Sequence, residues 1–144
     1  MARFLIVDAH SVIFSWPELS ALHRRRMLLA RESLIKTLTQ YQDISSVRVV
    51  VVFDGQGEQP SETTEPGGIQ VFYSGQGQTA DDVIERLVAK YAQEHDLTVA
   101  TNDLVEQDTA ASFGAVCIST DILRGLLEEA VAGFERELKR HRHK

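Results

Sequence analysis

Residues 4–8 read FLIVD, a continuous apolar run that ends in an aspartate, and residues 47–54, VRVVVVFD, repeat the pattern. Apolar runs of this kind are typical of strands that are buried on both faces of a parallel sheet. Elsewhere in the chain, shorter apolar runs bounded by turn residues predict further strands. The expected strands are Phe4–Val7, Val47–Phe53, Ile69–Tyr73, Leu97–Ala100 and Val116–Ile118.

Apolar residues at helical spacing follow the first strand. They predict one long helix that begins near Trp16-Pro17 and ends near Gln42. A second helix is expected to open at Thr79, because Thr79 with Asp82 three residues later approximates a capping box. The apolar face of that helix predicts that it packs on the sheet.

Two more helices are expected in the last third of the chain: a short one that ends near Phe113, and a last one that starts at Thr120 and runs into a basic tail. Residues Gly55–Gly68 contain almost no large apolar side chain and are expected to form an exposed loop. Because strands alternate with helices, the sequence predicts a three-layer α/β/α domain with a central, mainly parallel sheet of about five strands.

The chain has 144 residues, of which 43% are hydrophobic, and this is enough for one core. We therefore expect a single domain over residues 1–144, with a basic tail from about residue 139. No apolar stretch approaches the roughly 20 residues that cross a bilayer, and the N-terminus lacks a secretory apolar segment. The single cysteine, Cys117, lies between Val116 and Ile118 and is expected in a buried strand. These features predict a protein of the reducing cytoplasm with no membrane partner.

The formal net charge of −6 argues against a nucleic-acid binder that relies on overall positive charge. Basic residues nevertheless gather at Arg24, Arg25 and Arg26 and again at Lys139–Lys144, while acidic residues dominate the middle of the chain. An enzyme that holds a divalent cation in an acidic pocket and binds a polyanion at its rim has this distribution. Basic residues in a last helical turn also complement the helix dipole, which accounts for the tail without any ligand.

Aspartates end three of the expected strands, at Asp8, Asp54 and Asp103, and Asp81 and Asp82 lie in the first turn of a helix. Parallel strands place their carboxyl ends at one edge of the sheet, where ligands bind in open α/β folds. Neighbouring carboxylates repel one another unless a cation is present, and hard oxygen ligands favour Mg²⁺ or Mn²⁺. Each aspartate alone is also common in turns and at helix N-termini, so it is their number at one edge that favours a metal site.

Several segments, in this order and at these spacings, resemble a known family. They are LIVDAHSVI at 5–13, WPE at 16–18, VVVFDG at 50–55, QTADDVIERLV at 78–88 and VATNDLVEQ at 99–107. The resemblance is to the NYN domains of the PIN-like nuclease group, most closely the YacP-like branch, and it covers nearly the whole chain. It implies a metal-dependent endoribonuclease that uses one or two Mg²⁺ or Mn²⁺ ions, held by Asp8, Asp81, Asp82 and Asp103, with Asp54 in support.

The first motif departs from the family pattern, which typically reads Asp-Gly-Tyr-Asn, whereas this chain has Asp8-Ala9-His10-Ser11. Ser11 can still donate a hydrogen bond to a carboxylate, although it is shorter than an asparagine amide. His10 is expected to pack or to form hydrogen bonds rather than to bind metal. The other acidic positions are intact, which favours retained activity. The residues expected to contact RNA are Ser11, Asn102, Arg24, Arg25 and Arg26.

Two other functions fit the sequence less well, and one alternative stays open. Gly75–Ala80 fits a relaxed dinucleotide fingerprint, but only two clear strands follow it, and Asp81 and Asp82 would place negative charge beside the pyrophosphate. A receiver domain would need a lysine near the fifth strand, and Val116–Asp121 contains none. The open alternative is a catalytically weak PIN-like module that binds RNA or a protein partner. A homo-oligomer is equally compatible with the sequence.

Overall fold

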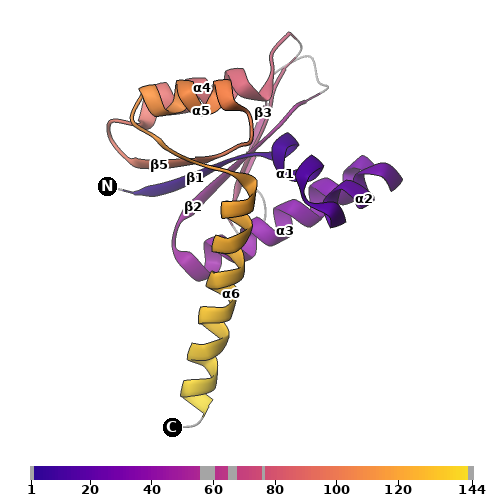
Figure 1. Cartoon of the computed structure of the whole chain (residues 1–144), viewed down its shortest axis with the longest axis vertical. Helices are drawn as coiled ribbons and strands as arrows, with labels where there is room; N and C mark the ends of the chain where they lie inside the picture. Colours follow the sequence, from indigo (N-terminus) through magenta and orange to yellow (C-terminus); the bar gives the residue numbers. More distant parts are fainter. Residues whose placement is uncertain (1, 56–60, 65–67, 76, 143–144) are drawn as a thin grey trace.

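The computed structural model describes residues 2–55, 61–64, 68–75 and 77–142, and for residues 61–64 it describes the backbone alone. Within these residues a sheet of six strands occupies the centre of the fold, in the order β3-β4-β2-β1-β5-β6 (Figure 1). β3 pairs antiparallel with β4, and every other neighbouring pair is parallel. The strands are β1 (Arg3–Asp8), β2 (Arg48–Phe53), β3 (Ser61–Thr64), β4 (Gln70–Tyr73), β5 (Asp96–Ala100) and β6 (Val116–Ile118).

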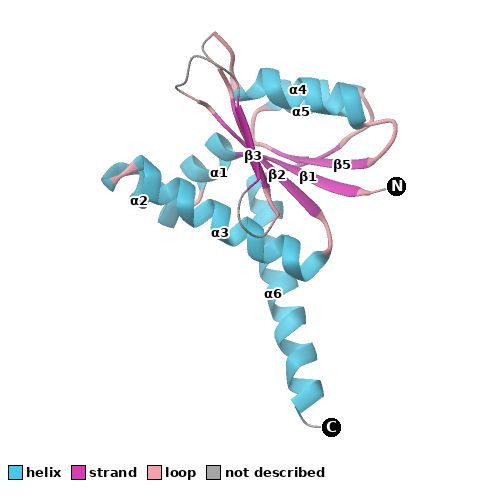
Figure 2. Ribbon diagram, turned by 180° about the vertical axis from the view of Figure 1, so that it is seen from behind, coloured by secondary structure: helices cyan, strands magenta, loops and turns pink. Residues whose placement is uncertain are grey.

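Helices cover both faces of this sheet (Figures 1 and 2). α4 and α5 pack on one face, while α1, α2, α3 and the first half of α6 pack on the other. The second half of α6 extends beyond the sheet (Figure 2). Among the described residues, no helix is both long and apolar enough to cross a membrane. The helices are α1 (Ala9–Ser15), α2 (Pro17–Arg25), α3 (Met27–Ser45), α4 (Ala80–Tyr91), α5 (Leu104–Ser112) and α6 (Thr120–Arg142).

Successive side chains of the central strand β1 point to opposite faces of the sheet and belong to two separate hydrophobic cores. Leu5 and Val7 pack with α1, α3 and α6 on one face, whereas Ile6, between them, packs under α4 and α5 on the other. Because β1 is buried on both faces, its apolar run is continuous, as the sequence predicts. The predicted three-layer fold class and its mainly parallel sheet are confirmed, and each expected strand is present.

The prediction of one long helix from Trp16-Pro17 to Gln42 is wrong, because the chain forms two helices there, α2 and α3, and a further helix, α1, precedes them. The predicted start is confirmed, since Trp16 has an extended backbone (φ −87°, ψ 118°) between α1 and Pro17, the first residue of α2. A proline ring clashes with a helical residue before it, so the helix ends at that point. Trp16 is buried, and its indole Nε1 donates to the carbonyl of Thr120 at 3.2 Å. The break inside the predicted helix falls at Arg26, which is also extended (φ −158°, ψ 125°) and separates α2 from α3.

The expected loop at Gly55–Gly68 contains a strand, β3, which pairs with β4 in a register that sets Ser61 opposite Tyr73. The segment reads SETT and lacks the apolar alternation that marks a half-buried strand. Its consecutive threonines favour extended backbone, but this preference depends on a neighbouring strand. The hydrophobic pattern therefore could not predict this antiparallel edge strand. Its extended backbone is stabilised by pairing with β4.

The carboxyl edge of the parallel strands collects the starts of several helices. β1 ends at Asp8, and α1 begins at the next residue. α4 follows β4 and α5 follows β5, so the first turns of both helices lie at this edge. The capping box predicted for α4 is confirmed, since Thr79 and Asp82 exchange hydrogen bonds there. Side chains that are distant in sequence thus meet beyond the end of β1.

Candidate metal centre at the carboxyl edge of the sheet

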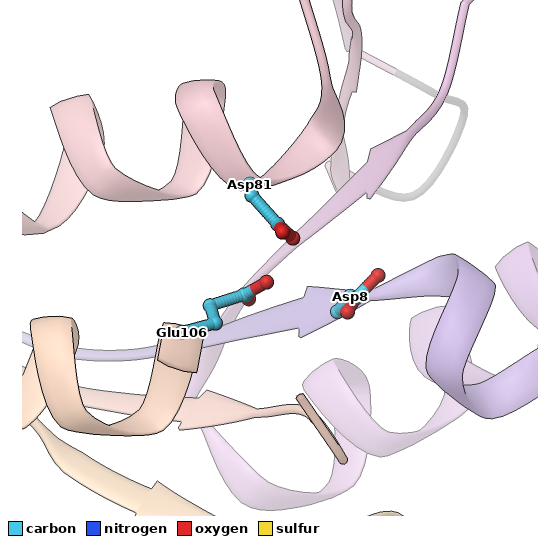
Figure 3. A group of neighbouring side chains, drawn as sticks. All are labelled: Asp8, Asp81 and Glu106. Atoms are coloured by element: carbon cyan, nitrogen blue, oxygen red, sulfur yellow. The ribbon is translucent and has the colours of Figure 1, made fainter. Parts of the chain in front are cut away.

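Three carboxylates converge beyond the end of β1 (Figure 3). Asp8 is the last residue of β1, Asp81 lies in the first turn of α4, and Glu106 lies in the first turn of α5. One oxygen from each lies within 4.8 Å of the others. Asp8 and Glu106 are only 4% and 6% exposed, whereas Asp81 is exposed. The cluster is therefore closed on the side of the sheet and open to solvent at Asp81.

Two hydroxyls hold the Asp8 carboxylate in place. Ser11 Oγ and Thr101 Oγ1 each donate to Asp8 Oδ2 at 2.9 Å. The backbone N–H of Asn102 donates to Ser11 Oγ at 3.1 Å, and that of Asp103 donates to Thr101 Oγ1 at 3.1 Å. Because the hydroxyls accept from the backbone, their own protons are left for Asp8. The other oxygen, Oδ1, has no side-chain hydrogen bond within the described part of the chain.

Burial raises the pKa of Asp8, and the hydrogen bonds from Ser11 and Thr101 oppose that rise because they stabilise the ionised form. The negative charge of Asp81 adds a further, smaller increase to the pKa. The net direction is upward. Asp8 is therefore already oriented for a ligand, and a bound cation would stabilise its buried negative charge.

Glu106 has a strongly raised pKa at this edge. Both of its carboxyl oxygens are buried, and neither has a hydrogen-bond partner among the residues that the structure describes. Burial is the main cause that raises the pKa of Glu106 to about 10. The proximity of the Asp81 carboxyl group, which can share the Glu106 proton, is the next cause, and the negative charges of Asp8, Asp81 and Asp103 raise the pKa further. Without a cation, Glu106 therefore holds a proton at neutral pH.

This arrangement fits a divalent cation. A buried carboxyl group without partners is costly, and a cation would contact its oxygens and remove the repulsion from Asp8 and Asp81. All the candidate ligands are hard oxygens, which suit magnesium-like ions rather than ions that prefer sulfur. The acidic cluster can therefore bind a metal, and Asp8, Asp81 and Glu106 are the residues that would hold it.

The other aspartates predicted for the metal site lie at the same edge but bind backbone N–H groups. Asp82 Oδ2 accepts from the N–H of Thr79 at 3.0 Å, which completes the capping box of α4. Asp103 Oδ1 accepts from the N–H groups of Val105 and Glu106 at 3.0 and 3.2 Å. Both carboxylates stabilise helix N-termini in this way. Asp103 remains close enough to raise the pKa of Glu106.

Asp54, predicted as a supporting carboxylate, anchors the start of α4. Its Oδ1 accepts from the N–H of Ala80, the first residue of that helix, at 2.7 Å. Ala80 immediately precedes Asp81. Asp54 therefore fixes the helix end that presents Asp81 to the cluster, and it does so from the end of a neighbouring strand.

The residues predicted to contact RNA fall into two groups. Ser11 contacts Asp8, and Asn102 is tied to the start of α6: its Nδ2 donates to Thr120 Oγ1 at 2.9 Å, and its Oδ1 accepts from the N–H of Thr120 at 3.0 Å. Both polar ends of the Asn102 side chain are thus engaged by α6. Exposed side chains at the end of α2 form the second group, Arg24, Arg25 and Arg26.

Glu106 was missed by the sequence analysis, although it lies inside the VATNDLVEQ segment. The available signal was the interval of three residues between Asp103 and Glu106, which places both acids at the start of one helix. That interval equally describes an ordinary capping box. Only the position of α5 beside β1 and α4 distinguishes the two roles.

Comparison with known proteins agrees with this fold. Residues 5–144 match the YacP-like NYN domain. The chain is 33% identical to the uncharacterized protein YacP of Bacillus subtilis (strain 168), over 94% of this chain and 79% of the relative. The crystal structure of Rae1 (YacP) from Bacillus subtilis is 30% identical with a TM-score of 0.78, over 95% of this chain and 80% of that chain. A single-residue mutant of that protein gives a TM-score of 0.81 at 28% identity, over 98% and 84%.

The family model covers nearly the whole chain, and the solved relatives share its three-layer arrangement, which is of the PIN-like type. The resemblance drawn from the sequence motifs is therefore confirmed. This chain belongs to the YacP-like NYN domain family, a family of the nuclease type.

Proposed function

We propose that this protein is an endoribonuclease that hydrolyses RNA phosphodiester bonds with one or two Mg²⁺ or Mn²⁺ ions. The observation that carries the proposal is the buried Glu106 carboxyl group, which lies without a hydrogen-bond partner beside Asp8 and Asp81. A structural role would pair those oxygens, as Asp82 and Asp103 are paired at helix starts. Membership of a nuclease-type family supports the same reading.

A divalent cation held by Asp8, Asp81 and Glu106 would lower the pKa of a water molecule and stabilise negative charge on the phosphate. Water would attack the phosphorus and the bond between phosphorus and the 3′ oxygen would break. The 3′ oxygen would leave with its ribose and take up a proton, which gives a 3′-hydroxyl on one product and a 5′-phosphate on the other.

The protein's own residues prepare this reaction. Ser11 and Thr101 orient Asp8 before any substrate arrives, and the helix start fixed by Asp54 presents Asp81. Such preorganisation avoids the cost of reorienting charged groups during the reaction. Because Asp81 is exposed while Asp8 and Glu106 are buried, RNA would reach the cluster at Asp81.

The test is single-turnover cleavage of one defined, end-labelled single-stranded RNA at saturating Mn²⁺. Glu106→Gln is expected to lose cleavage, whereas the matched control Glu94→Gln, at an exposed position after α4, is expected to keep the wild-type rate. Full activity of Glu106→Gln would remove Glu106 from the mechanism. A wild type that binds Mn²⁺ and still leaves the RNA intact would favour a catalytically weak module that binds RNA or a protein partner.

A further inference from the structure

Three aromatic rings form a row on α1 and α2, the helices that follow Asp8 in the chain. The ring centroids of His10 and Phe14 lie 4.6 Å apart, and those of Phe14 and His23 lie 4.8 Å apart. His10 is two residues beyond Asp8, and Phe14 follows one turn later on the same face of α1. The row therefore leads from the end of β1, along α1, to the last turn of α2.

The rings are available to a ligand. Phe14 is 52% exposed and His10 is also exposed, although large aromatic side chains usually bury most of their surface. His23 is half-buried: its Nδ1 is a buried atom without a hydrogen-bond partner among the described residues, and its ring contacts that of Phe14.

A local positive charge adjoins the row. Arg24, Arg25 and Arg26 follow His23 directly, and all are exposed. Within the described part of the chain, none of them forms a salt bridge with a carboxylate. Their charge is therefore uncompensated by close acidic partners, although the chain as a whole carries −6.

Exposed rings beside unpaired guanidinium groups match the chemistry of a nucleic-acid single strand. Each base offers a flat face for stacking, and the phosphates attract arginine. In a duplex the base faces are already stacked on one another, so the rings favour a single strand. Phe14 lies five residues along α1 from Ala9, a rise of about 7.5 Å, and Ala9 directly follows Asp8, so one strand can contact the row and the acidic cluster together.

We propose that His10, Phe14 and His23 form a base-stacking site for single-stranded RNA, with Arg24–Arg26 binding the phosphates that follow. The identity of the nucleic acid rests on the proposed ribonuclease function, and the stacking site determines how its substrate is held. RNA then runs from the acidic cluster along α1 toward the end of α2.

The experiment measures binding of a labelled single-stranded oligoribonucleotide to the full chain by fluorescence anisotropy in EDTA, where metal-dependent cleavage is blocked. Phe14→Ala is expected to weaken binding about 5- to 100-fold, the range for loss of one stacked base. Phe14→Trp is expected to retain binding. The matched control is Phe134→Ala on α6, where the phenylalanine is 43% exposed, and it is expected to bind like the wild type.

Two further probes separate stacking from charge. An oligomer of the same length without bases is expected to bind wild type and Phe14→Ala equally, because it offers no ring to stack. Arg24→Gln, Arg25→Gln and Arg26→Gln together are expected to flatten the dependence of affinity on salt, whereas Phe14→Ala leaves that dependence unchanged.

The proposal is overturned if Phe14→Ala binds the single strand as tightly as Phe134→Ala, or if its loss is equal for oligomers with and without bases. The stacking site and the ribonuclease function can be tested separately. If RNA binding depends on Phe14 but the protein never cleaves RNA, the stacking site is supported and the ribonuclease function is refuted. If metal-dependent cleavage is unaffected by Phe14→Ala, the ribonuclease function is supported and the stacking site is refuted.

Discussion

The hydroxyl of Thr101 accepts the backbone N–H of Asp103 at 3.1 Å, and this hydrogen bond releases Glu106 from helix capping. Asp103 is the N-cap of α5, and Glu106 lies three residues later, where a capping-box glutamate would bind the N-cap N–H. At the start of α4 Asp82 does bind the equivalent N–H, that of Thr79. At α5 Thr101 takes that N–H instead, so the Glu106 carboxyl group is left to face Asp8 and Asp81.

Neighbouring aspartates at the start of α4 are expected to have separate roles. Asp81→Asn should weaken Mn²⁺ binding at least about tenfold, because it removes a charged ligand from the cluster. Asp82→Ala should keep the Mn²⁺ affinity but lose about 1 kcal/mol of unfolding free energy, because it breaks the capping box. Titration calorimetry and urea unfolding of both variants check this. Equal loss of Mn²⁺ affinity in the two variants would return Asp82 to the metal site.

The metal-free protein is expected to lose stability as pH rises. The pKa of Glu106 is about 10 in the folded chain against an ordinary value of 4.5, so between these values the folded state holds a proton that the unfolded state has released. Stability is therefore greatest at the acidic end of this window and falls as pH increases, by at most about 1.4 kcal/mol per pH unit for one proton. The raised pKa of Asp8 acts in the same direction.

Urea unfolding in EDTA between pH 6 and 9 measures this dependence. Glu106→Gln should reduce the slope of unfolding free energy against pH, while Glu94→Gln, at an exposed position, should retain it. A slope in Glu106→Gln that equals the wild-type slope would show that Glu106 does not hold the proton.

Metal binding is expected to release protons. At pH 7.5 the Glu106 carboxyl group must lose its proton to bind a cation, so Mn²⁺ binding should release about one proton per protein. Calorimetric titrations in buffers with different ionisation enthalpies give the number released. In Glu106→Gln the release should fall close to zero, and an unchanged number would assign the proton to another group.

Ser11 is expected to support catalysis although an asparagine is typical at this position in the family. Its hydroxyl donates to Asp8, and it also accepts the N–H of Asn102. Ser11→Ala should slow single-turnover cleavage about ten- to a hundredfold, since a hydrogen bond to a charged group contributes roughly 1.5–3 kcal/mol. Ser112→Ala, at an exposed position at the end of α5, is the matched control.

Ser11→Asn tests whether the serine limits the reaction. An asparagine amide has longer reach toward Asp8, so a modest increase in cleavage rate is expected. The comparison uses the same RNA at saturating Mn²⁺, with Asp8→Asn as the inactive reference. A wild type that is already fast and a Ser11→Asn variant that is no faster would show that the serine suffices.

Local sequence was enough to predict the five parallel strands, the sheet that they form and the edge where the acids gather. Continuous apolar runs report burial on both faces of a strand, and Thr79 with Asp82 reports a helix start through contacts only three residues apart. These features depend on neighbours along the chain. The order and spacing of the sequence motifs likewise predicted the family, and the comparisons confirm it.

Contacts between distant residues decided the rest. The strand β3 exists only beside β4, and the indole of Trp16 is held by the carbonyl of Thr120, more than a hundred residues away. Asp103 and Glu106 have the same spacing whether they cap α5 or bind a cation. The packing of α4 and α5 on one face of β1 brings Glu106 to Asp8 and Asp81, and Thr101 occupies the N–H that would otherwise hold it. The carboxylates of this cluster were therefore selected by tertiary structure, because a side chain's direction depends on which neighbours satisfy its hydrogen bonds.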